Sequence, residues 1–99
     1  MAKVVFNACH GGFSLSTEAV VRGREISGEP QWGSNIYLNP IPRHDRTLVR
    51  VVEELGRRAN GKYADLRVAE IEGSRYWIDE YDGSESVETP ESIAWVTIA

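Results

Sequence analysis

The most constraining feature of the sequence is an amphipathic pattern between Asp45 and Asn60. Apolar residues recur there at helical spacing, on the single face formed by Leu48, Val51, Val52, Leu55 and Ala59. Asp45 is a suitable N-cap, and Asn60-Gly61 offers a left-handed C-terminal cap. The segment therefore predicts a helix over residues 45–60 that buries one face against the rest of the chain.

Short β-branched or alternating segments flank this helix and predict strands. They lie at Lys3–Ala8, Leu66–Ile71, Tyr76–Tyr81 and Ser84–Glu88, with two further candidates at Asn35–Leu38 and Ile93–Ile98. Asp82-Gly83 is a strong signal for a two-residue hairpin turn between the third and fourth of these. The first strand is bounded by Gly11-Gly12, and its composition suggests a central position in a sheet.

A first helix is predicted from Ser16, a good N-cap, to about Gly28. The order is then strand, helix, irregular loop, helix and a run of strands. A late run of strands joined by tight turns favours an α+β fold. We expect one domain over residues 1–99, with a mostly antiparallel sheet of four to five strands and two helices on one face.

Composition and charge exclude several functional classes. The formal net charge is −4, whereas a general nucleic-acid binder needs an excess of Lys and Arg to displace counterions. Cys9 is the single cysteine, which fits a reducing compartment. No signal peptide is visible, and no apolar run approaches the roughly 20 residues that span a bilayer. The expected location is cytoplasmic, without a membrane partner.

The turn after the first strand is the first candidate site. Two adjacent glycines allow positive φ and expose successive N–H groups, and a helix N-terminus follows. Together with two serine hydroxyls, they could cradle a phosphate or carboxylate. The alternative is a tight connection with Phe13 in the core, because neither a P-loop nor a dinucleotide fingerprint is present. The candidate ligand-binding residues of this turn are Asn7, Cys9, His10, Gly11, Gly12, Phe13, Ser14 and Ser16.

A second candidate cluster, Arg43, His44 and Arg46, precedes the long helix. Guanidinium groups bind phosphate bidentately. Arg43 and Arg46 also lie at the positive end of a helix, which is unfavourable unless an anion or a carboxylate is near. Trp32, in a loop rich in Gly and Pro, is a candidate contact or lid residue. The loop from Glu29 to His44 is either functional or a simple surface excursion.

Signals for catalysis and metal binding are weak. Cys9 and His10 are adjacent on an extended segment and so point to opposite faces, which pairs them poorly as nucleophile and base. His44 is an alternative base, with Asp45 as its orienting group. The Cys and His spacing matches no zinc site. We assign no catalytic residue, no metal and no cofactor, and we expect the acidic segment from Asp79 to Glu91 to form a solvated hairpin.

Three stretches resemble a family of small phage-encoded proteins. They are NACHGGFSLSTEAV, LVRVVEELGRRANGKYADLRVAEIE and YWIDEYDGSESV, which carry a GGFSLS turn, a VVEELG-x-x-ANG helix end and an EYDG hairpin. The resemblance covers most of the chain except Glu29–Pro42. It implies a phage origin, and by analogy of size and origin a counter-defence role, but it assigns a role to no individual residue.

These observations lead to one leading hypothesis and two alternatives. The leading one is a phage-encoded protein that sequesters a cyclic nucleotide immune signal of the host without turnover. So small a domain would enclose a nucleotide-like anion best at a subunit interface, so a homo-oligomer is expected. The alternatives are an inhibitor that binds a host defence protein through the acidic hairpin, and a small nucleotide hydrolase.

Overall fold

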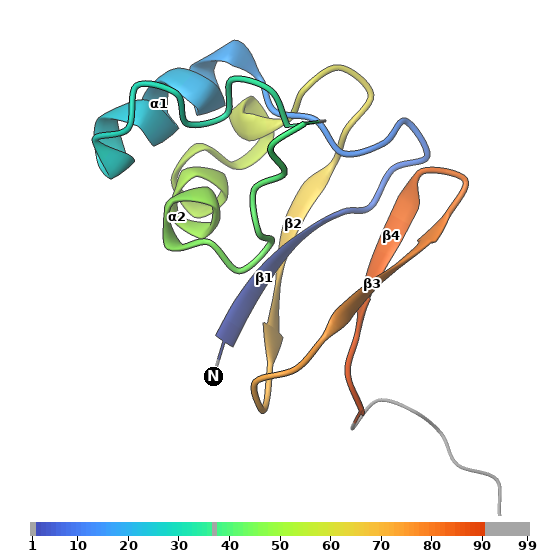
Figure 1. Ribbon diagram of the computed structural model, residues 1–99. Coiled ribbons are helices and arrows are strands. Elements are labelled where there is room, and N and C mark those ends of the chain that lie inside the picture. The colour runs from blue at the N-terminus through green and yellow to red at the C-terminus, as the bar shows by residue number, and fades with distance from the viewer. Residues whose placement is uncertain (1, 37, 91–99) are drawn as a thin grey trace, which may run out of the picture.

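The computed structural model describes residues 2–36 and 38–90. Its elements follow in the order shown in Figure 1. They are β1 (Ala2–Asn7), α1 (Thr17–Ser27), α2 (Arg46–Leu55), the 3-10 helix η1 (Gly56–Ala59), β2 (Leu66–Ile71), β3 (Trp77–Tyr81) and β4 (Ser84–Glu88). The α+β class is confirmed, with two α-helices and four antiparallel strands among the described residues.

The strands form two separate two-stranded sheets rather than one sheet. β1 pairs with β2, and β3 pairs with β4 across Asp82-Gly83, which has the positive φ angles expected of that turn. The other edge of β1 is already covered. The N–H of Val5 donates to the carbonyl of Arg43 at 2.8 Å, and the N–H of Asn7 donates to the Glu85 carboxylate at 2.9 Å. β4 therefore meets β1 through a side chain and not through a backbone ladder.

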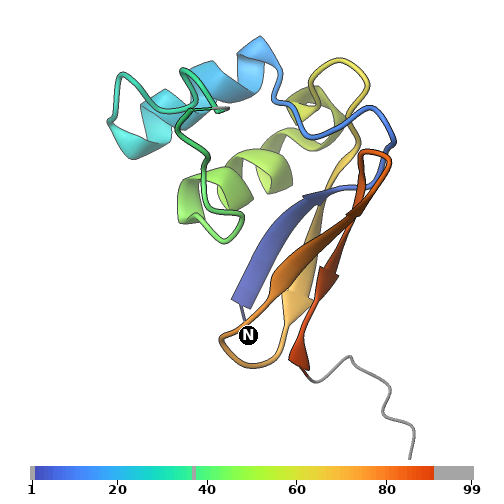
Figure 2. The ribbon, with the colours of Figure 1, turned by 45° about the vertical axis from the view of Figure 1, so that its right-hand side comes forward.

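The molecule has three layers, seen in Figure 2: the helices, the β1–β2 pair, and the β3–β4 hairpin. Val4 and Val5 of β1 are both fully buried. Adjacent strand residues face opposite sides, and Val5 belongs to the core on the helix side, so Val4 faces away from the helices. β1 is thus buried on both faces, with both helices on one side of it. The predicted central position was wrong, because β1 is one of only two strands in its sheet among the described residues.

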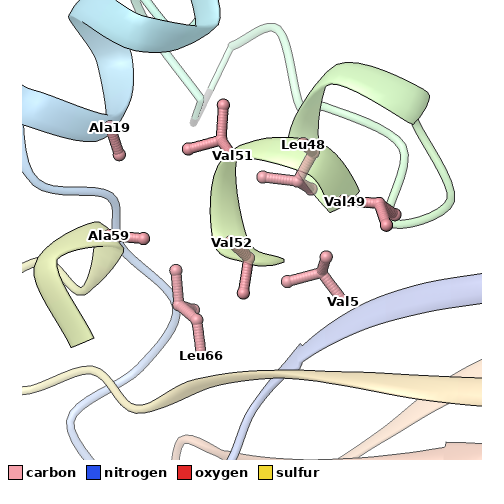
Figure 3. Packing of buried hydrophobic residues seen from close by; sticks show 8 residues of the cluster. All are labelled: Val5, Ala19, Leu48, Val49, Val51, Val52, Ala59 and Leu66. Atoms are coloured by element: carbon pink, nitrogen blue, oxygen red, sulfur yellow. The ribbon is translucent and has the colours of Figure 1, made fainter. Parts of the chain in front are cut away.

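Figure 3 shows the core on the helix side. It contains Val5, Ala19, Leu48, Val49, Val51, Val52, Ala59 and Leu66. The apolar positions predicted for the second helix are therefore confirmed, with Leu55 partly buried at its end. Ser16 and Asp45 are the N-caps, accepting the N–H groups of Ala19 and Leu48, each at 3.0 Å. Within the described residues no helix is long and apolar enough to cross a membrane.

Two boundary predictions were wrong. The second helix ends at Leu55, because Gly56 takes a φ of 58° and the chain continues as a 3-10 turn. Asn60 is extended and is not a left-handed cap; its Oδ1 accepts the N–H of Leu66 at 2.8 Å. The strand predicted at Asn35–Leu38 is also wrong, because residues 36 and 38 lie in turns around a bond from the Asn39 N–H to the Asn35 carbonyl. The strand predicted at Ile93–Ile98 lies outside the described residues.

Trp32 packs on α1 instead of acting as an exposed lid. A Cβ added to Gly23 would lie 2.0 Å from the Trp32 ring, so this helix position needs glycine for close packing. We expect Gly23→Ala to lower stability by about 1–2 kcal/mol, because overpacking outweighs the gain in helix propensity. Urea unfolding monitored by circular dichroism measures this. A stabilised Gly23→Ala protein would show that Trp32 is not packed there.

Candidate functional site

Asn7 ties the glycine turn to two distant segments. Its side chain is fully buried. Nδ2 donates to the carbonyls of Cys9 at 2.6 Å and Gly83 at 2.9 Å. Oδ1 accepts the N–H groups of Asp65 at 2.8 Å and Cys9 at 3.3 Å. Both N–H groups and both lone pairs of the amide are thereby used, so Asn7 holds the turn in place and has no group left to offer a ligand.

The two glycines of the turn have different surroundings. A Cβ on Gly11 would lie 2.1 Å from the carbonyl oxygen of Tyr63, so Gly11 is packed against the segment before β2. Gly12 has a φ of 90° and open space where a Cβ would lie. The hairpin tip closes the other side, because a Cβ on Gly83 would lie 2.1 Å from the His10 carbonyl. Only Gly12 of the pair therefore faces open space.

The histidine and serine side chains of the turn make hydrogen bonds within the protein. The His10 ring lies with Nδ1 3.1 Å from the Asp82 carbonyl, and Ser14 Oγ donates to the Lys62 carbonyl at 3.3 Å. Ser16 Oγ donates to the Arg58 carbonyl while it caps α1. Cys9 is a partly exposed free thiol, and in the described part of the chain neither histidine hydrogen-bonds to it. These contacts explain the turn as a structural clamp.

A pocket of about 240 Å³ brings part of the predicted site together. Gly12, Phe13 and Arg43 line it, as the sequence suggested, with the Arg43 guanidinium 3.8 Å above the Phe13 ring. However, Arg43 is paired through both terminal nitrogens with Glu85, whose side chain is only 7% exposed. Glu80 adds a second carboxylate to the lining. The carboxylate that Arg43 requires is therefore internal, and a phosphate in this pocket would meet two negative groups.

His44 and Arg46 line a different and larger depression, of about 600 Å³. We call it the basic groove, lined by Ala2, Lys3, His44, Arg46, Val49, Arg50 and Glu53. The lining residues come from the start of β1, from His44 just before the N-cap of α2, and from one face of α2. Arg46 and Arg50 are one helical turn apart, so they lie on the same face as Val49 and Glu53. The groove thus gathers three permanent cations and one carboxylate around an apolar floor.

The charged groups of the basic groove differ in how they are held. Lys3 Nζ lies 2.7 Å from the Glu53 carboxylate, and the hydrogen bond to Glu53 is the main cause that raises the pKa of Lys3. His44 Nδ1 lies 2.7 Å from the Tyr76 hydroxyl, and the two rings meet edge to face. Neither Arg46 nor Arg50 makes a hydrogen bond or ion pair with another of the described residues. Arg46 is therefore free to bind an anion. Arg50 makes no ion pair with a described residue either, although the hydrogen bond from Arg22 and, to a lesser extent, the charge of Arg50 lower the pKa of Glu54.

The structure therefore places the site residues predicted from the sequence in separate parts of the molecule. Trp32 packs on α1 and lines neither pocket, and Arg43 and Arg46 belong to different sites. Sequence reasoning missed Lys3 and Arg50. The spacing of Arg46 and Arg50 by four residues could have predicted that they share one face of the helix. Lys3 could not have been predicted in this way, because it reaches the groove only through the packing of β1 beside α2. Within the described residues no group of three or more potential metal ligands is present.

No family model, no curated protein and no solved structure matches this chain. The resemblance to small phage-encoded proteins stays a prediction.

Proposed function

We propose that this protein binds a phosphate-bearing, nucleotide-like ligand in the basic groove and captures it without turnover. The observation that carries the proposal is the concentration of Lys3, Arg46 and Arg50 in one groove of a chain whose formal net charge is −4. Such local reversal of sign, in a concave site, attracts anions from solution.

The chemistry of the groove suits a phosphate. A guanidinium presents a planar fork that matches two phosphate oxygens, and the N-terminal end of α2, where Arg46 is the first residue, adds a positive dipole. His44 Nε2 adds a further donor when Nδ1 accepts the Tyr76 hydroxyl, because Nε2 then carries the ring proton. Ala2, which is partly exposed, offers apolar surface to a sugar or base, and Val49 adds little because it is only 8% exposed. The ligand would thus be held by charge at one end and by apolar contact at the other.

The expected affinity follows from the exposure of these groups. A hydrogen bond to a charged group contributes about 1.5–3 kcal/mol, and an open groove is screened by salt. A few such contacts give a Kd in the micromolar range, since 1 µM corresponds to about −8 kcal/mol. Sequestration of a signal needs tighter binding, and a second copy that closes the groove would provide it by excluding water. We therefore include a homo-oligomer in the proposal.

Arg46→Gln is expected to weaken nucleotide binding by about 10- to 100-fold, because it removes a charged bidentate contact. Isothermal titration calorimetry with pyrophosphate, ATP, cyclic mononucleotides and cyclic dinucleotides measures this. Arg57→Gln is the matched control, since it removes the same charge from an exposed position on η1 that lies outside the groove.

Two results would count against the proposal. One is the absence of binding heat from every compound of the panel at low salt. The other is binding that Arg46→Gln and Arg57→Gln weaken equally. Chromatography of the titrated nucleotides distinguishes capture from the hydrolase alternative, because capture returns each nucleotide intact.

A further inference from the structure

The outward side of the β3–β4 hairpin carries two large aromatic side chains. The register places Trp77 opposite Glu88, Asp79 opposite Ser86 and Tyr81 opposite Ser84, so these six residues share one face, here called the hairpin face. Trp77 is 44% exposed and Tyr81 is 79% exposed. Glu80 and Glu85, on the opposite side of the hairpin, line the pocket with Phe13 and Arg43. The hairpin face therefore points away from the other described residues.

This face is held in a defined shape. The Asp82-Gly83 turn sets the register of the hairpin, and Gly83 is packed against the His10 carbonyl. The Glu85 carboxylate fixes β4 to the edge of β1, because it accepts the N–H of Asn7, and its ion pair with Arg43 holds it in place. Trp77, Asp79 and Tyr81 follow one another at every second position, about 7 Å apart along the strand. Two exposed rings with a carboxylate between them are thus presented on a rigid support, as is typical of an interaction site.

Charge selects the kind of partner. The sequence from Tyr76 to Pro90 contains no Lys or Arg, and its acids are Asp79, Glu80, Asp82, Glu85 and Glu88. A nucleic-acid backbone would be repelled here. Contact between the hairpin faces of two copies would bring Asp79 and Glu88 against the same acids. A cationic side chain, by contrast, can stack on the rings and pair with the Asp79 carboxylate.

We propose that the hairpin face binds an extended, Lys- or Arg-rich segment of a partner protein. Cationic side chains at alternate positions of that segment match the spacing of the aromatic rings along β3. The charged contacts set orientation and association rate, and the rings supply the buried apolar area. The hairpin face is distinct from the basic groove. The protein would therefore have one site for an anion and a second surface for a cationic segment of a partner protein.

Synthetic peptides test this directly. At 50 mM salt a labelled ten-residue peptide of alternating Lys and Thr is expected to bind with a Kd of tens of micromolar, measured by fluorescence anisotropy. Its Glu–Thr counterpart is expected not to bind. Raising the salt to 300 mM should weaken binding at least fivefold, because the contacts are exposed charges.

Matched variants locate the site. Tyr81→Ser and Asp79→Asn are each expected to weaken binding by about 5- to 30-fold. Tyr63→Ser, at another highly exposed aromatic, and Glu72→Gln, at another exposed acid, should leave it unchanged. All four positions are exposed, so folding is checked simply by circular dichroism. Failure of the Lys–Thr peptide to bind would overturn the proposal, as would equal losses in the control variants. Concentration-dependent self-association that Tyr81→Ser abolishes would assign the face to a second copy and would also overturn it.

Discussion

Asn7→Leu is expected to lower the free energy of unfolding by about 4 kcal/mol, since each buried polar group left unpaired costs about 1–3 kcal/mol. Leucine has the same branching as asparagine but a larger volume, so some overpacking adds to the loss at this fully buried position. It leaves the carbonyls of Cys9 and Gly83 and the N–H groups of Cys9 and Asp65 without their buried partner. Such a loss is a large part of the about 5–15 kcal/mol that stabilises an ordinary domain.

Urea unfolding followed by circular dichroism gives this difference. Asn39→Ala is the control, because the Asn39 side chain is exposed, and we expect it to change stability by less than about 0.5 kcal/mol. A loss below about 1 kcal/mol for Asn7→Leu would contradict the description of Asn7 as the residue that holds three segments together.

Glu85→Ala is expected to lower the free energy of unfolding by about 3 kcal/mol, because it leaves the partly buried Arg43 guanidinium unpaired and uncovers the β1 edge. Arg43 is only 21% exposed at its side chain, and its Nη2 lies 2.9 Å from Glu85 Oε2. The same carboxylate accepts the N–H of Asn7. The change therefore removes the contact that fixes the hairpin to β1, and partial opening of the hairpin should accompany the loss.

A double-mutant cycle with Arg43→Ala separates the ion pair from the bond to β1. The coupling energy is expected to be about 1.5–3 kcal/mol, with a residual cost of Glu85→Ala in the Arg43→Ala background. Glu80→Ala is the control, because Glu80 lies opposite Glu85 on the same strand pair and two like charges repel there. We expect it to be neutral or slightly stabilising. A Glu85→Ala protein as stable as the Glu80→Ala protein would refute this description.

Local patterns in the sequence predicted most of the elements. The second helix followed from apolar spacing and the Asp45 cap, and the hairpin followed from Asp82-Gly83, because each depends on residues close together in the chain. The helix end was misplaced for the same reason: apolar spacing continues to Ala59 through the 3-10 turn, although Gly56 interrupts the α-helix. Periodicity reports which face is buried, and it does not separate one helix type from another.

The division into two sheets was not predictable from local patterns. It depends on a carboxylate that reaches the edge of β1 from 78 residues further along the chain. The same Glu85 carboxylate also determines what the pocket beside the glycine turn can bind. The sequence analysis grouped Gly12, Phe13 and Arg43 as candidate site residues, and the structure places them in one pocket. It did not reveal that Arg43 forms an ion pair with Glu85. Arg46 has no ion-pair partner within residues 2–36 and 38–90, because the residues one turn further along α2 are Val49 and Arg50 rather than an acid.

An NMR titration of isotope-labelled protein with pyrophosphate tests most directly where a small anion binds. We expect saturable shifts in the amide signals of Lys3, His44, Arg46 and Arg50, with the signals of Gly11 and Gly12 unchanged. Shifts confined to Gly11, Gly12 and Phe13, with an unaffected α2 N-terminus, would contradict it and return the ligand to the glycine turn.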